Sequence, residues 1–72
     1  MQYLTNNFYS KYHTTAVNGN SKIDTKRCIK KLNKWLAKPD QQDVKVDDFD
    51  FKQEWGVESQ YRTRLTIIYH HE

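Results

Sequence analysis

The sequence predicts a small α+β domain of the β-α-β-β type, with a three-stranded sheet in the order 1-3-2 and one helix packed on one face. Three observations support this prediction: one amphipathic helical stretch, β-prone segments on both sides of it, and a length of 72 residues, which fits a single domain over 1–72. A monomer of this size buries only about 60% of the surface that its unfolded chain exposes, so its stability would be marginal.

The first strand is predicted at about 7–17, where Tyr, Phe, Thr and Val are frequent. Phe8, Tyr12 and Ala16 would share one face of this strand, and the residues that follow each of them would share the other. Polar residues between these positions blur the alternation. Residues 1–6 are either an arm or an early extension of the strand.

The helix is predicted over 21–38, after a turn at 18–20. Ser21 and Asp24 have the spacing of a capping box, in which side chains satisfy free backbone N–H groups at the start of a helix. Pro39 ends the helix, because proline lacks an N–H and restricts the residue before it.

The two faces of this helix differ in chemistry. At about 100° per residue the apolar residues fall in one arc, with Thr25 beside it. They are Cys28, Ile29, Leu32, Trp35 and Leu36. The basic residues lie roughly opposite, and they are Arg27, Lys30, Lys31, Lys34 and Lys38.

The second strand is predicted at about 44–55. Its apolar residues change parity between Val46 and Phe49, which is what a β-bulge near Asp47 and Asp48 would produce. The alternative is that each face of the strand is half apolar, with one face against the helix and the other toward a second subunit.

The third strand is predicted at about 59–70, after a hairpin turn at Gly56. It is apolar on both faces near Leu65 to Tyr69, which suits the central position of the sheet. The helix returns the chain so that strand 2 runs parallel to strand 1. The sheet face away from the helix then lacks a cover, and we expect the exposed apolar residues there to form a homodimer interface. They are Phe49, Phe51, Trp55 and Ile68.

Charge is unevenly distributed along the chain. Residues 22–38 carry seven positive side chains and one negative, while the rest carries five positive and eight negative. The basic stripe of the helix is therefore a candidate nucleic-acid-binding surface, formed by Arg27, Lys30, Lys31, Lys34 and Lys38. The plainer interpretation is a solvated helix face, and the sequence shows no helix-turn-helix, zinc-finger or RNA-recognition motif.

Catalytic and metal-binding patterns are absent from the sequence. A single cysteine, Cys28, excludes an internal disulfide, and its place on the apolar face predicts an inert buried thiol. His13, His70 and His71 have no metal-ligand spacing with it. We expect no metal, no cofactor and no enzymatic activity. No stretch approaches the roughly 20 apolar residues of a membrane span, so we expect a cytoplasmic protein that does not bind membranes.

Two core patterns carry a resemblance. Leu32-Asn33 is followed by Trp35-Leu36 in the helix, and the closing strand ends in Leu65-Thr66-Ile67-Ile68-Tyr69. Over about 8–70 the layout resembles short β-α-β-β proteins of Gram-positive bacteria and their phages, including a small sporulation-associated family. The resemblance implies a fold and no activity.

Two hypotheses for the function follow. The first is a small non-catalytic binding or regulatory protein that acts through protein–protein contacts as a dimer, with an unknown protein partner. A phage or mobile-element accessory protein would fit this size. The second is a nucleic-acid-binding protein that uses the basic face of its helix.

Overall fold

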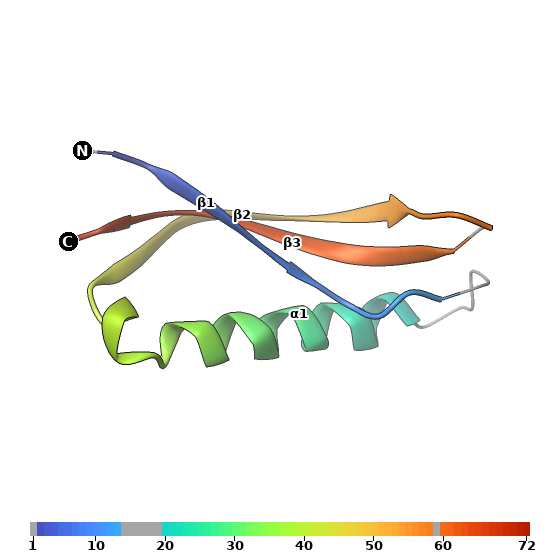
Figure 1. Ribbon diagram of the computed structural model, residues 1–72, viewed down its shortest axis with the longest axis horizontal. Helices are drawn as coiled ribbons and strands as arrows, with labels where there is room; N and C mark the ends of the chain where they lie inside the picture. The colour runs from blue at the N-terminus through green and yellow to red at the C-terminus, as the bar shows by residue number, and fades with distance from the viewer. Residues whose placement is uncertain (1, 14–19, 59) are drawn as a thin grey trace.

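The described part of the chain forms two layers, a three-stranded sheet and one α-helix that runs beneath it (Figure 1). The computed structural model describes residues 2–13, 20–58 and 60–72, and the side chains of all of these except Asn20 and Ser21. The strands are β1 (Leu4–Tyr9), β2 (Val44–Trp55) and β3 (Tyr61–His71), and the helix is α1 (Asn20–Leu36). A short 3-10 helix, Pro39–Gln41, follows α1.

The strand order is β1-β3-β2, as the sequence predicts. Both outer strands pair antiparallel with β3, so β1 and β2 run in the same direction. The most apolar strand is thus in the centre, where it is covered on both edges. The register of β2 shifts between Val46 and Asp48, which confirms the predicted bulge. Because of this extra residue, Val46 and Phe49 lie on the same face of the sheet.

The first strand differs from its prediction of 7–17. It begins at Leu4 and ends at Tyr9, and residues 14–17 lie outside the described residues. Tyr9 lies opposite Arg64, and His13 lies opposite Tyr61. The segment from Tyr9 to His13 is therefore one residue longer than the segment of β3 that it faces.

The extra residue is accommodated at Ser10. Its Oγ accepts a hydrogen bond from the N–H of Thr63 at 2.9 Å, while its own N–H donates to the Thr63 carbonyl. This irregularity reverses the alternation that places Tyr12 beside Phe8. His13 lies opposite Tyr61 instead, and Tyr12 is exposed.

The helix lies close to its predicted limits of 21–38. It ends at Leu36, and Pro39 begins the 3-10 helix rather than continuing α1. The Gln42 side-chain amide donates to the carbonyls of Leu36 and Lys38, and the first of these contacts satisfies a free carbonyl at the end of α1. The predicted turn at 18–20 lies mostly outside the described residues, and so does the side chain of the predicted cap, Ser21.

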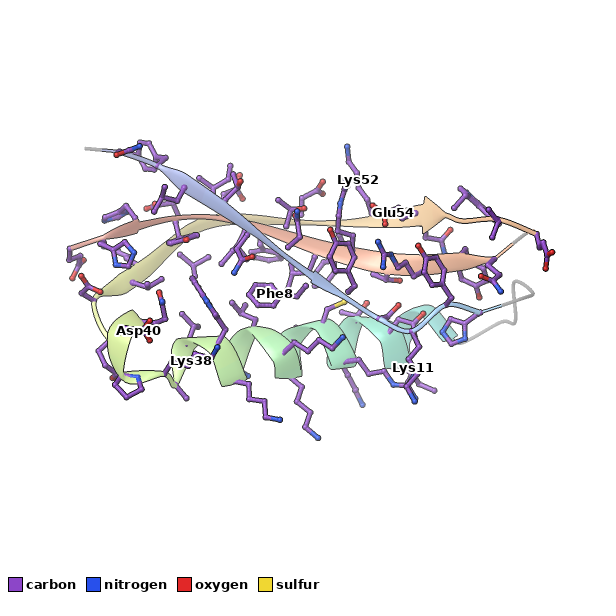
Figure 2. The ribbon with its side chains drawn as sticks, in the orientation of Figure 1. Phe8, Lys11, Lys38, Asp40, Lys52 and Glu54 are labelled. Carbon is purple, nitrogen blue, oxygen red and sulfur yellow. The ribbon has the colours of Figure 1, made fainter. Side chains whose placement is uncertain are left out.

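The core lies between α1 and the sheet, where Phe8 is visible in Figure 2. Its buried members are Phe8, Cys28, Leu65 and Ile67. Partly buried side chains surround them: Leu32, Trp35, Val46, Phe51 and Tyr69. The predicted apolar arc of the helix therefore faces the sheet, except that Ile29 is 41% exposed.

The face of the sheet away from α1 is polar, contrary to the expectation of an open apolar face. In the paired register its described members on β2 and β3 include Asp48, Asp50, Lys52, Arg62 and Arg64. Glu54 joins the two strands, since its carboxylate accepts hydrogen bonds from Arg62 at 2.7 Å and Arg64 at 3.1 Å. Lys52 and Glu54 project away from the helix in Figure 2.

Within the described part of the chain, no helix is long and apolar enough to cross a bilayer.

Candidate functional site

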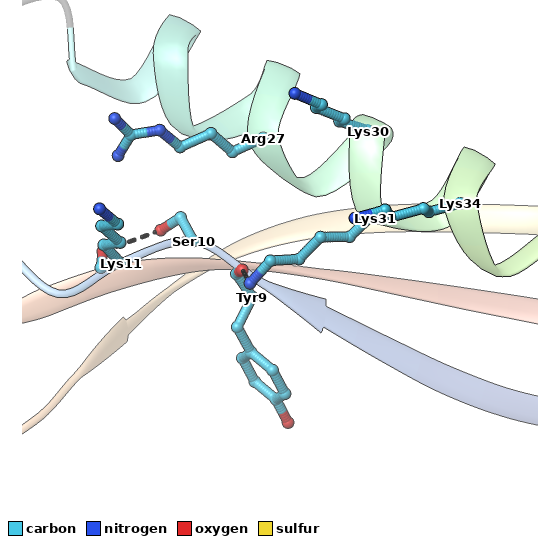
Figure 3. Close-up of a pocket in the computed structure, with 7 residues that line it drawn as sticks. All are labelled: Tyr9, Ser10, Lys11, Arg27, Lys30, Lys31 and Lys34. Atoms are coloured by element: carbon cyan, nitrogen blue, oxygen red, sulfur yellow. Dashed lines mark hydrogen bonds between the residues drawn. The ribbon is translucent and has the colours of Figure 1, made fainter.

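A basic groove lies between α1 and the chain segment that continues β1. One part of it is a depression of about 250 Å³, shown in Figure 3. Five cations line it together with Tyr9 and Ser10, and they are Lys11, Arg27, Lys30, Lys31 and Lys34. A second depression of about 280 Å³ continues the groove along the helix, past Phe8 and Trp35 to Lys38.

The helix places three of these cations on one flank. Arg27, Lys31 and Lys34 follow at intervals of four and three residues, which keeps them on one side of the α-helix, and Lys38 follows just beyond its end. That flank faces β1 because the apolar arc holds the helix against the sheet. The Nζ of Lys31 donates to the Tyr9 carbonyl at 2.5 Å and so links the two walls of the groove.

Positive charge in the groove has no compensation from its own lining. Neither depression has an aspartate or glutamate among the residues described as lining it. The nearest acid on the helix is Asp24, which is fully buried and accepts a hydrogen bond at 2.8 Å from His13 Nε2 when that nitrogen carries its proton. Such an arrangement favours an anionic ligand.

The basic residues predicted from the sequence all line this groove. One further cation was missed, because Lys11 lies in the segment that was predicted to be strand. The irregularity at Ser10 ends β1 just before Lys11 and brings it opposite Arg27 (Figure 3). The alternation of the sequence carries no sign of this placement.

An apolar groove lies on the other side of α1, between the helix and β2. It encloses about 190 Å³, and every lining residue is apolar: Ile29, Leu32, Val46, Phe49, Phe51 and Leu65. The Phe49 and Phe51 rings meet edge to face at 5.9 Å between centroids, and Phe49 is 62% exposed. The mouth of this groove is therefore an aromatic surface in contact with water.

The four residues predicted to share an interface on the uncovered face do not share a face. Phe49, Phe51 and Trp55 lie opposite Ile67, Leu65 and Tyr61, which places all three on the helix side of the sheet. Ile68 alone lies on the outer face, where it is 38% exposed among polar neighbours. The cause is the position of α1, which packs against β1 and β3 and leaves the helix side of β2 open.

Three tyrosines that could stack on nucleic-acid bases are engaged within the protein. The guanidinium of Arg62 lies over the Tyr9 ring at 3.9 Å, and its hydrogen bond to Glu54 raises the pKa of Arg62. Tyr61 is buried, and Tyr69 packs edge to face on Trp35. These contacts give Tyr9, Tyr61 and Tyr69 packing roles within the protein.

The thiol and the histidines are bound to other partners. Cys28 is fully buried, its Sγ lies 3.6 Å from the Thr63 carbonyl, and burial raises the pKa of the thiol. His70 bonds Asp47, and His71 bonds Asp43, a contact that lowers the pKa of Asp43. Within 2–13, 20–58 and 60–72, no group of three His, Cys, Asp or Glu is placed to hold a metal ion.

No protein-family model, curated protein or solved structure matches this chain. The resemblance to the small sporulation-associated family therefore stays a prediction.

Proposed function

We propose that this chain is a non-catalytic nucleic-acid-binding protein whose basic groove holds a phosphate backbone. The observation that carries the proposal is the gathering of six cations along one groove whose described lining contains no acid. Lysine and arginine contacts to phosphates release condensed counterions, which is the main source of sequence-independent affinity.

The dimensions of the groove fit several phosphates. At 1.5 Å per residue, the seven residue steps from Arg27 to Lys34 extend over about 10 Å of helix, and Lys38 follows just beyond the end of α1. One strand of B-form DNA carries a phosphate about every 3.4 Å along its axis, so about four phosphates fit along this flank. Lys11 contributes from the opposite wall.

The lining favours backbone binding without base readout. Five of its six cations are lysines, which bind phosphate as point charges, whereas base edges are read mainly by Arg, Asn and Gln. The tyrosines that would stack on unpaired bases are packed within the protein. We therefore expect little discrimination between sequences.

The structure changes the order of the two hypotheses. Protein–protein contact through an open apolar sheet face was the stronger idea from sequence alone, and it depended on an outer face that is in fact polar. The basic stripe, in contrast, forms one wall of a groove instead of a solvated convex surface. This favours nucleic-acid binding over the original dimer.

Fluorescence anisotropy with labelled duplex DNA, single-stranded DNA and RNA between 50 and 200 mM salt tests the proposal. For about four phosphate contacts, the slope of log K against log salt is expected near −3.6 for duplex and near −2.8 for single strands. The comparison also shows which form binds more tightly. Absence of binding to all three at 50 mM salt would refute the proposal.

Two charge-reversed pairs on the same helix localise the site. Lys30→Glu with Lys34→Glu removes two groove cations, and we expect binding at 50 mM salt to be lost. Lys22→Glu with Lys26→Glu makes the same change in net charge at exposed positions that line neither groove, and it should retain most of the affinity. Equal losses from both pairs would show that net charge, not the groove, governs binding.

A further inference from the structure

We propose that β2 is a self-pairing edge, through which two copies of this chain form a continuous six-stranded antiparallel sheet centred on Asp50. The occupant of the surface beside the apolar groove is thus a second copy. The inference is independent of nucleic-acid binding, because the basic groove lies on the opposite side of α1.

The edge of β2 away from β3 offers backbone groups for pairing. In the described part of the chain, β2 has β3 on one side and no strand on the other. The N–H of Gly56 points to β3, since it donates to the Gln60 carbonyl at 2.8 Å. Backbone groups alternate in direction along a strand, so Phe49, Phe51 and Gln53 direct theirs outward. The Phe49 N–H donates to the Asp48 carboxylate at 2.8 Å, and pairing would exchange this contact for a carbonyl of the second copy.

This direction restricts how a second β2 can pair. Residues whose backbone groups point outward must lie opposite each other in the two copies. A two-fold antiparallel pair of β2 strands is therefore centred on a single residue. Moving the centre by one residue along β2 gives the next possible register. Paired side chains then lie on the same face of the sheet. Three central registers can be compared by the charges they bring together on the polar face.

Charge selects the register that is centred on Asp50. In this register Asp48 of each copy lies opposite Lys52 of the other, which gives two pairs of opposite charge. The only residues of like charge that lie opposite each other are the two copies of Asp50. A centre on Phe49 brings Asp48 opposite Asp50 twice and pairs no opposite charges among Asp48, Asp50, Lys52 and Glu54. A centre on Phe51 gives two Asp50–Lys52 pairs but also two Asp48–Glu54 repulsions.

Charged residues on an edge strand commonly prevent it from pairing with another strand. In β2 the acidic residues disfavour pairing in the registers centred on Phe49 and Phe51.

The same register covers the exposed aromatic surface. Phe49 lies opposite Phe51 of the second copy, and this contact occurs twice. Four phenyl rings therefore meet on the helix side of the joined sheet, beside the mouth of the apolar groove. Cross-strand aromatic pairs are among the more favourable contacts of antiparallel sheets. The bend at the Asp47 bulge lies beyond this central segment and leaves residues 48–52 regular.

The first test is the mass of the full chain in solution. Sedimentation equilibrium up to about 100 μM is expected to show a species of twice the 8.7 kDa of one chain. A strictly monomeric chain over this range would overturn the proposal.

Single substitutions then locate the interface. Phe49→Glu should make the chain monomeric, because it places a charge in the four-ring cluster. Val57→Glu is the matched control, since Val57 is also an exposed apolar residue (77%) but lies in the hairpin turn. It should remain dimeric. Ile68→Thr probes the outer face of the sheet. If Ile68→Thr were monomeric and Phe49→Glu dimeric, the interface would lie on the outer face and pairing through β2 would be rejected.

Two isosteric changes test the register. Asp48→Asn removes two opposite-charge contacts and should weaken association by about 2- to 30-fold. Asp50→Asn removes the repulsion at the two-fold axis and should strengthen association by up to about fivefold. Both substitutions change the net charge of the chain equally. Opposite effects on the affinity of self-association can therefore come only from the register. Effects of the same sign would refute the centre on Asp50.

Discussion

The two sides of α1 carry opposite chemistry although they share one helix. On the β1 side, cations spaced by three and four residues line a groove with a main-chain carbonyl at its edge. On the β2 side, Ile29 and Leu32 face two phenylalanines, and the described residues that line this groove include no polar side chain. The difference shows that the helix separates two binding surfaces because it packs on β1 and β3 and leaves β2 uncovered.

A change in the core beneath α1 should affect both grooves, because both depend on the packing of α1 on the sheet. Leu65 is 1% exposed and belongs to the core under α1, so Leu65→Ala is expected to lower the free energy of unfolding by about 2–5 kcal/mol. Urea denaturation measures this loss. Ile68→Ala on the other face of the same strand should have a much smaller effect, and equal losses would show that α1 does not hold the core as described.

A change outside the helix should show whether the basic side is a groove or only a stripe. Lys11→Gln removes one cation from the wall opposite α1. We expect the slope of log K against log salt for duplex binding to become less steep by about 0.9, which corresponds to one phosphate contact. An unchanged slope would mean that the helix binds alone and that the β1 wall takes no part.

The outer face of the sheet provides a reference that belongs to neither groove. Glu54→Gln weakens its contacts with Arg62 and Arg64, and we expect the free energy of unfolding to fall by less than about 1 kcal/mol, because the three side chains are partly solvated. Duplex affinity and self-association should stay unchanged. A large loss of either would place that activity on the outer face.

The Cys28 thiol, which is buried under α1, reports whether the helix stays packed on the sheet. Burial raises the pKa of Cys28 above its ordinary value of 9.0, so the folded state holds the proton more tightly than the unfolded state. The resulting stability is present below pH 9.0 and is lost as pH rises through the folded pKa. Cys28→Ala should remove this part of the pH dependence, as measured by urea midpoints between pH 8 and 10. Identical pH profiles for the two proteins would contradict a buried thiol.

Much of the fold could be predicted because its signals are local. The parity change between Val46 and Phe49 indicated the bulge, and the two-sided apolar character of β3 indicated its central place. The flank of Arg27, Lys31 and Lys34 could also be read from helical spacing. These features depend on the order of neighbouring residues, which periodicity records directly.

Features that depend on how elements are placed against one another could not be predicted. Periodicity identifies the apolar face of α1 but not its lateral position, so Phe49, Phe51 and Trp55 were placed on the wrong face of the sheet. The bond from Ser10 to Thr63 and the burial of Asp24 beside His13 depend on contacts between distant segments. No local pattern marks such contacts.

The separation of the two grooves is tested most directly by the duplex affinity of the monomeric Phe49→Glu variant. A hairpin duplex of about six base pairs spans about 20 Å. The two β1 strands of a six-stranded dimer would be about 24 Å apart, so this duplex occupies one groove at a time. We predict that the variant binds the hairpin with the affinity of the unchanged chain to within about threefold, because Phe49 lines only the apolar groove. A loss as large as that of the Lys30→Glu and Lys34→Glu pair would contradict the account.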